Sequence, residues 1–129
     1  MTAGKTILLV DDDVNLVAAL KMTFESEGFK VHTAYSGDAG LKAAREVRPD
    51  AIVLDVMMDG KHGFNVCREL KSDDKLRGIG VLIFSGMTGM NDPKYPRNVG
   101  MANEADDYLP KPAKPREVVE RVKELIGRG

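Results

Sequence analysis

The sequence predicts a single α/β domain in which a parallel β-sheet is covered by helices on both faces. Short apolar segments alternate with amphipathic segments five times along the 129 residues, and this alternation is typical of parallel strands joined by helices. Residues 51–54 are apolar without interruption, as expected for a strand that is covered on both faces. The crossovers between the strands should then be right-handed.

The composition fits one domain, residues 1–129, that can bury its own core. Hydrophobic residues make up 43% of the chain and charged residues 30%, which is typical of a globular protein. The apolar runs are too short to insert into a membrane, and no signal peptide precedes the first predicted strand. The one cysteine, Cys67, excludes an internal disulfide and favours a cytoplasmic location. A net charge of −1 argues against direct binding to nucleic acid.

The first half of the chain is divided by clear capping and breaking residues. The predicted strands are residues 6–10, 29–34 and 51–55. Helices are predicted between them, from Asp13 to Gly28 and from Ser36 to about Val47. Asp13 and Ser36 are the expected N-caps, because their side-chain oxygens can accept a hydrogen bond from the first helical turn. Pro49 stops the second helix.

In the second half of the chain, the alternation of strands and helices is interrupted in one segment. The predicted strands are residues 81–85 and 107–109, and the predicted helices are residues 64–72 and a last helix that begins at Pro115. Between the fourth and fifth strands, residues 86–103 contain two glycines and two prolines after Gly86 and no continuous helical stripe. We therefore expect the fourth helix to be short or missing.

Acidic side chains stand at the ends of two predicted strands. Asp11 and Asp12 follow the first strand, and Asp55 ends the third. Because ligands bind at the carboxyl ends of strands in open α/β sheets, these carboxylates should converge, and they would repel one another unless a cation lies among them. A divalent metal site is the simplest interpretation. Ser85 ends the fourth strand and Lys111 follows the fifth, which adds a hydroxyl and an ammonium group.

These groups are the parts needed to move a phosphoryl group onto an aspartate. The reaction uses a carboxylate nucleophile, a hard cation, a hydroxyl donor and a lysine. Mg²⁺ suits this set, because it takes one or two carboxylates, keeps several waters and completes its octahedron with phosphate oxygens. Lys111 would neutralise phosphoryl charge.

Four motifs give the chain a resemblance to the receiver domains of response regulators in two-component signalling, the CheY-like superfamily. They are LVDDD at residues 9–13, VLDVMM at 53–58, FSG at 84–86 and ADDYLPKP at 105–112. Each motif alone is weakly specific, but four in this order and spacing are highly specific, and the resemblance covers the whole chain. It implies a flavodoxin-like five-stranded sheet of order 2-1-3-4-5 and a cis peptide bond between Lys111 and Pro112.

The resemblance also implies a role for each site residue. Asp55 would accept a phosphoryl group from the phosphohistidine of a histidine kinase or phosphotransfer protein, with Mg²⁺ or Mn²⁺ as cofactor. The ligands of the ion would be Asp11, Asp12, Asp55 and the backbone carbonyl of Met57. Ser85 and Lys111 would hold the phosphoryl oxygens. Ser85 and Tyr108 would form a switch that signals to a downstream protein.

Three other functions share parts of this pattern. A haloacid-dehalogenase-type phosphatase also forms an aspartyl phosphate, but it needs a second acid two residues after the nucleophile, where this chain has Met57. A flavodoxin-type FMN protein binds phosphate after the first strand, where residues 11–13 would repel it. A receiver fold that serves as an interaction module with an altered output face stays open, because residues 86–103 depart from the family. The favoured prediction is a phosphoacceptor, not an enzyme.

Overall fold

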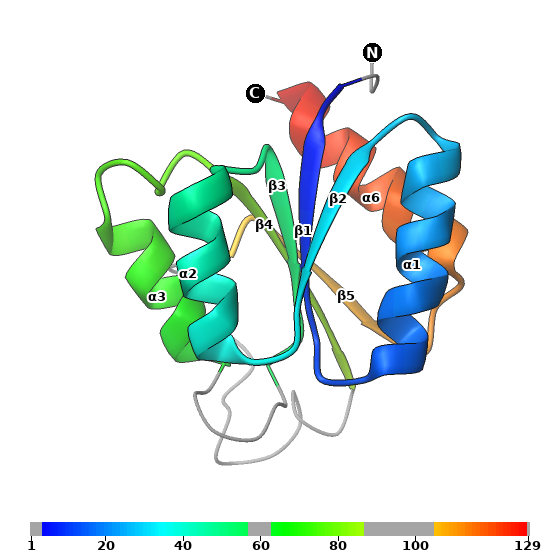
Figure 1. The fold of residues 1–129 in the computed structure, drawn as a ribbon, viewed down its shortest axis with the longest axis horizontal. Helices are drawn as coiled ribbons and strands as arrows, with labels where there is room; N and C mark the ends of the chain where they lie inside the picture. The colour runs from blue at the N-terminus through cyan, green and yellow to red at the C-terminus, as the bar shows by residue number, and fades with distance from the viewer. Residues whose placement is uncertain (1–3, 57–62, 87–104, 129) are drawn as a thin grey trace.

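The computed structural model describes residues 4–56, 63–86 and 105–128 (Figure 1). The strands are β1 (Thr6–Val10), β2 (Lys30–Ala34), β3 (Ala51–Leu54), β4 (Gly80–Gly86) and β5 (Asp107–Lys111). The helices in the described ranges are α1 (Val14–Ser26), α2 (Gly37–Val47), α3 (Gly63–Ser72) and α6 (Pro115–Arg128). None of these helices is long and apolar enough to span a membrane.

The five strands form one parallel sheet in the order β2-β1-β3-β4-β5. Helices α2 and α3 cover one face of the sheet, and α1 and α6 cover the other (Figure 1). The predicted doubly wound sheet and its strand order are therefore confirmed, as is the cis peptide bond between Lys111 and Pro112. The fourth helix, expected to be short or missing, would fall within residues 87–104, which lie outside the described residues.

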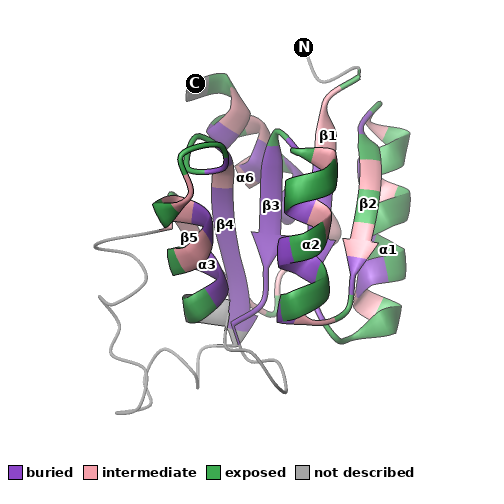
Figure 2. Cartoon of the chain, turned by 60° about the vertical axis from the view of Figure 1, so that its left-hand side comes forward, coloured by how far each residue is buried: buried purple, intermediate pink, exposed green. Residues whose placement is uncertain are grey.

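Alternate side chains of the sheet enter two separate cores. In β1, Ile7 and Leu9 pack beneath α1 and α6, whereas Leu8 and Val10 pack beneath α2 and α3. All four are at most 1% exposed, and burial of a side chain of this size contributes about 1.5–3 kcal/mol. Strands β3 and β4 are buried along most of their length (Figure 2). Because both faces of the sheet are covered by helices, the central strands have apolar sequences without polar residues at alternate positions.

The helix starts follow the capping residues. Asp13 accepts a hydrogen bond from the Leu16 N–H at 3.1 Å, and Ser36 accepts one from the Ala39 N–H at 3.1 Å. Each bond satisfies one of the backbone donors that the first turn of a helix leaves unpaired. The two predicted N-caps are confirmed. Gly28, which follows α1, has a φ of 93°, a left-handed conformation that glycine adopts without strain.

Four of the five strands differ from the prediction by one or two residues at an end. Strand β2 begins at Lys30 rather than at residue 29, and β4 extends from Gly80 to Gly86 rather than from residue 81 to 85. Strand β3 ends at Leu54, so that Asp55 lies just beyond it. Strand β5 continues past Leu109 to Lys111. The predicted strand ended at Leu109, before Pro110, and a proline has no N–H to donate to a neighbouring strand. Strand β5 is at the edge of the sheet, where a missing backbone donor is tolerated.

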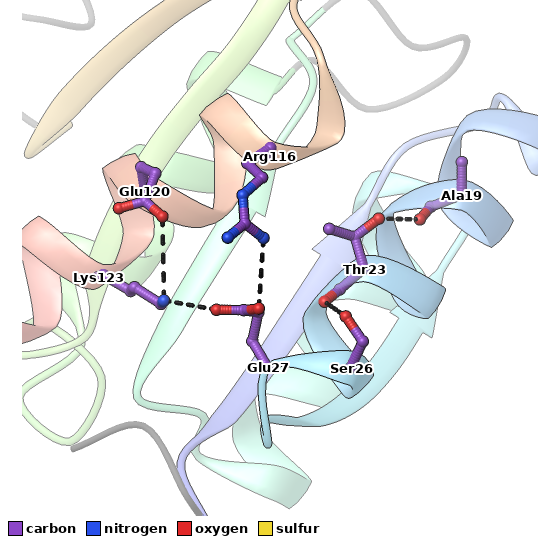
Figure 3. A network of polar contacts seen from close by, with 7 residues as sticks. All are labelled: Ala19, Thr23, Ser26, Glu27, Arg116, Glu120 and Lys123. Carbon is purple, nitrogen blue, oxygen red and sulfur yellow. Dashed lines mark hydrogen bonds and ion pairs between the residues drawn. The ribbon is translucent and has the colours of Figure 1, made fainter.

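Glu27 joins the end of α1 to α6 (Figure 3). Its Oε1 accepts a hydrogen bond from Lys123 Nζ at 2.6 Å, and its Oε2 accepts one from Arg116 Nη1 at 3.3 Å. The hydrogen bond from Lys123, and after it the one from Arg116, lower the pKa of Glu27. The ionised carboxylate therefore stabilises the contact between the two helices that cover one core.

The pKa of Glu27 predicts how stability responds to acid. An acid whose pKa is lowered by folding contributes stability that is complete above its ordinary pKa of 4.5 and is lost as the pH falls through the lowered folded value. Glu27→Gln should therefore unfold at lower urea concentration near neutral pH, and its stability should fall less steeply in acid. Glu25→Gln is the control, because Glu25 makes no ion pair with the described residues. A difference between Glu27→Gln and the unaltered protein that is the same at every pH would contradict the assignment.

Candidate functional site

Three carboxylates meet at the carboxyl edge of the sheet. Val10 and Leu54 are register partners in the neighbouring strands β1 and β3, so the next residues, Asp11 and Asp55, leave the sheet side by side. The Asp55 N–H donates to the Val10 carbonyl at 2.9 Å. One carboxylate oxygen from each of Asp11, Asp12 and Asp55 lies within 4.8 Å of the others. Asp11 and Asp55 are each only 5% exposed, whereas Asp12 is exposed.

Lys111 brings an ammonium group from β5 into this cluster. Its Nζ lies 2.8 Å from Asp11 Oδ2 and 3.5 Å from Asp55 Oδ2. The same nitrogen is 5.4 Å from the centre of the Phe84 ring, a distance at which a cation is attracted to an aromatic face. The cation is thus held between two buried acids and one ring.

Ser85 adds a hydroxyl from β4. The residue is completely buried, and its Oγ–H donates to Asp55 Oδ1 at 3.0 Å. Asp55 therefore has a hydroxyl near one carboxylate oxygen and an ammonium near the other. Both are groups that stabilise negative charge on oxygen.

The electrostatics of the cluster favour a further cation. Burial raises the pKa of Asp11, although hydrogen bonds from Lys111 and the Asp13 N–H oppose the rise, and the charge of Asp55 adds to it. Burial alone would lower the pKa of Lys111, but the hydrogen bond to Asp11 and the charges of Asp55 and Asp11 together raise it. Lys111 is therefore charged at neutral pH. Counted by formal charge, three carboxylates and one ammonium group leave an excess of two negative charges at the site.

The donor set fits a hard divalent cation. Carboxylate oxygens are the ligands that Mg²⁺ and Mn²⁺ prefer, and three of them are close enough to share one ion. The excess of two negative charges matches the charge of such an ion. Met57, whose backbone carbonyl was the fourth predicted ligand, lies outside the described residues.

The structure brings together five of the residues that the sequence singled out: Asp11, Asp12, Asp55, Ser85 and Lys111. Tyr108 lies apart from them, half-buried against Val56 and Ile83. The pairing of Lys111 with Asp11, and its place over Phe84, were not predicted. No local signal in the sequence indicates either contact, because both depend on how β5 lies against the rest of the sheet.

Comparison with known proteins gives a consistent family match. A family model described as the response regulator receiver domain matches residues 7–123. The chain is 37% identical over 127 residues to the DNA-binding response regulator MtrA of Mycobacterium tuberculosis. The matched region covers 98% of this chain and 53% of MtrA. It is 40% identical over 124 residues to the transcriptional regulatory protein AfsQ1 of Streptomyces coelicolor, covering 96% of this chain and 52% of the relative. The chain thus spans about half the length of these curated relatives.

Solved structures share the fold. A CheY-like response regulator receiver domain protein from Methanospirillum hungatei superposes with a TM-score of 0.86 at 23% identity, covering 98% of this chain and 96% of that one. The response regulator DrrB of Thermotoga maritima, an OmpR/PhoB homologue, superposes with a TM-score of 0.81 at 27% identity, covering 97% of this chain and 54% of that one.

Proposed function

The chain belongs to the response regulator receiver domain family, and from this premise we propose that Asp55 accepts a phosphoryl group from a phosphohistidine. The observation that carries the proposal is the convergence of two further carboxylates, a hydroxyl and an ammonium group on this one buried carboxylate. A receiver domain is a signalling phosphoacceptor rather than an enzyme that turns over a substrate. Residues 1–129 are proposed to form one such domain, in the cytoplasm.

The chemistry follows from the groups around Asp55. A carboxylate oxygen of Asp55 forms a bond to phosphorus, while the bond from phosphorus to the donor's imidazole nitrogen breaks and leaves its electron pair on that nitrogen. The Ser85 hydroxyl and the Lys111 ammonium then lie near oxygens that carry phosphoryl charge. A Mg²⁺ or Mn²⁺ ion held by Asp11, Asp12, Asp55 and the Met57 carbonyl would supply further positive charge to these oxygens.

The same geometry supports a conformational switch. The Ser85 hydroxyl donates to Asp55 in this state, so it must turn away from that oxygen in order to bind a phosphoryl oxygen. Tyr108 is the register partner of Ile83, two residues before Ser85 on β4. A rearrangement at the end of β4 is therefore transmitted to the neighbouring strand that carries Tyr108. We assign Ser85 and Tyr108 to the switch on this ground.

The phosphodonor and the output are other proteins or domains. Val14, the first residue of α1, follows the acidic run directly and is 61% exposed, so its side chain is open to contact with a histidine kinase or phosphotransfer protein. The relatives are named as DNA-binding and transcriptional regulators. The net charge of −1 on these 129 residues gives no basic footprint for nucleic acid, which supports an output through a downstream protein or domain.

Labelling with acetyl phosphate tests the phosphoacceptor and its metal together. Intact mass should show one acid-labile phosphoryl group per chain with Mg²⁺ and none with a chelator. Asp12→Ala should raise the Mg²⁺ concentration for half-maximal labelling about tenfold, because one of the few charged ligands is lost. Asp13→Asn is the control, since Asp13 belongs to the same acidic run but caps α1, and asparagine caps equally well. Absence of labelling at any Mg²⁺ concentration would favour an interaction module.

A further inference from the structure

The aromatic ring beneath Lys111 comes from the strand that also carries Ser85. Phe84 directly precedes Ser85 on β4, and its side chain is buried in the core that α1 and α6 cover. Its register partner on β5 is Leu109, which belongs to the same core. Lys111 follows Leu109 by two positions, and alternate residues of a strand share one face of the sheet. The strands therefore place the side chains of Phe84 and Lys111 on one face, at the edge where the acidic cluster lies.

Three groups of the described chain attract the Lys111 ammonium, and one of them takes no part in the proposed reaction. Nζ lies 2.8 Å from Asp11 Oδ2, 3.5 Å from Asp55 Oδ2 and 5.4 Å from the centre of the Phe84 ring. Asp11 is a proposed ligand of the cation, and Asp55 is the proposed phosphoacceptor. Both carboxylates are thus shared with another group during phosphorylation, which weakens their hold on the ammonium group. The ring is neutral and buried, so its contact with Lys111 does not depend on what the carboxylates bind.

The contact depends on the ring itself and not only on the space that it fills. The face of an aromatic ring is negative and attracts a cation within about 6 Å of its centre, more strongly where water is excluded. The Lys111 side chain is 23% exposed and Phe84 is buried, so water is largely excluded from between them. An aliphatic side chain at position 84 would fill much of the same space, but it has no negative face. The identity of Phe84 therefore affects where the ammonium group lies.

We propose that Phe84 is a positioning residue for Lys111. Its ring holds the ammonium group beside Asp55 while Asp11 and Asp55 are engaged by a cation and a phosphoryl group. The charge of Lys111 then remains where it stabilises the phosphoryl oxygens. Phe84 acts only through Lys111. The inference rests on the proposed function of Asp55 as a phosphoacceptor.

Phe84→Leu separates the role of the ring from that of packing. Leucine keeps an apolar side chain in the core and removes the ring face. With acetyl phosphate at saturating Mg²⁺, the variant should be labelled about fivefold more slowly than the unaltered protein, as expected for the loss of one cation–ring contact. Phe24→Leu is the matched control and should be labelled at the unaltered rate. Phe24 is buried in the same core, but its ring packs edge-on against Phe29, with 5.3 Å between the ring centres. Equal slowing in the two variants would assign the effect to packing and overturn the proposal.

Fluorination of the ring provides a test that hardly alters packing. Replacing Phe84 in turn by 4-fluoro-, 3,5-difluoro- and 3,4,5-trifluorophenylalanine withdraws charge from the ring face step by step and changes its shape little. The labelling rate should fall with each step, by roughly threefold in total. The same series at Phe24 should leave the rate unchanged. A rate that does not follow the number of fluorine atoms at Phe84, or that follows it equally at Phe24, would contradict a role for the ring face.

Proton NMR of the metal-free, unphosphorylated protein reports the contact without any reaction. A proton above the face of an aromatic ring is shielded, so the ε-methylene protons of Lys111 should resonate upfield of those of the exposed Lys114. Lys111→Met removes these protons and so identifies their signal. The upfield shift should be lost in Phe84→Leu and kept in Phe24→Leu. An unshifted signal in the unaltered protein, or a shift that survives in Phe84→Leu, would show that the ring does not hold the ammonium group.

The labelling and NMR results together separate this inference from the function on which it rests. Labelling of the unaltered protein that is slowed by Phe84→Leu and by fluorination supports both. Labelling that does not depend on the ring would overturn the positioning role and leave Asp55 as the phosphoacceptor. Absence of labelling of the unaltered protein at any Mg²⁺ concentration would contradict the proposed function, and the positioning role with it, even where the Lys111 signal is shifted.

Discussion

Asp55→Asn is expected to abolish phosphorylation and to leave the fold intact. Asparagine keeps the shape of the side chain, and its amide oxygen can still accept the hydrogen bond from Ser85. It lacks the anionic oxygen that must attack phosphorus. The pair between Lys111 and Asp11 does not involve Asp55, so the centre of the site keeps one ion pair. Incubation with acetyl phosphate and Mg²⁺ should leave the intact mass of the variant unchanged while its amide spectrum stays dispersed.

Asp50→Asn is the matched control for this variant. The change is chemically the same, but Asp50 precedes β3 at the other edge of the sheet, whereas Asp55 follows it. The control should be labelled at the rate of the unaltered protein. Labelling of Asp55→Asn at that rate would move the phosphoacceptor to another residue.

Lys111→Met is expected to have opposite effects on metal binding and on phosphorylation. Methionine keeps most of the length of the side chain but removes the charge that lies 2.8 Å from Asp11 and 3.5 Å from Asp55. Without metal, the unfolding free energy should fall by about 1–3 kcal/mol, because Asp11 and Asp55 lose the ammonium group that they share. Mg²⁺ should bind more tightly, since no like charge opposes it. Labelling by acetyl phosphate should slow about a hundredfold, as expected when one stabilising charge is removed.

Urea unfolding with and without Mg²⁺, together with labelling rates at saturating Mg²⁺, measures these three effects. Lys114→Met is the control, because Lys114 lies close in sequence and its ammonium group makes no ion pair within the described residues. Loss of Mg²⁺ affinity in Lys111→Met would show that the ammonium group orders the carboxylates rather than competing with the ion.

The fold could be predicted largely because its signals are local. Apolar runs such as residues 51–54 mark buried strands, and Asp13 and Ser36 mark helix starts through contacts three residues away. The end of β5 was missed because Pro110 is a strong local signal against a strand. Pro110 is tolerated in the strand because β5 lies at the edge of the sheet. The position of a strand in the sheet depends on the whole fold and has no local signal in the sequence.

The site could be predicted because sheet topology brings strand ends together. Once β1 and β3 are neighbours, Asp11 and Asp55 must be close. The partners of Lys111 and Glu27 could not be predicted, because these contacts join residues 100 and 96 positions apart and depend on side-chain length and helix docking. The roles of Met57 and of residues 87–104 stay predictions, since these residues lie outside the described ranges.

Strand β5 is anchored unevenly along its length. At its amino end, Asp106 is bound by Lys71, and Arg121 contacts both Asp107 and the Tyr108 carbonyl. At its carboxyl end, the ion pairs of Lys111 with the acidic cluster take the place of such anchors. The carboxyl end of β5 is also paired with β4, where Lys111 is the register partner of Gly86. A change of partner by Lys111 is therefore expected to act on the carboxyl ends of β4 and β5 together, and to leave the contacts at Asp106 in place.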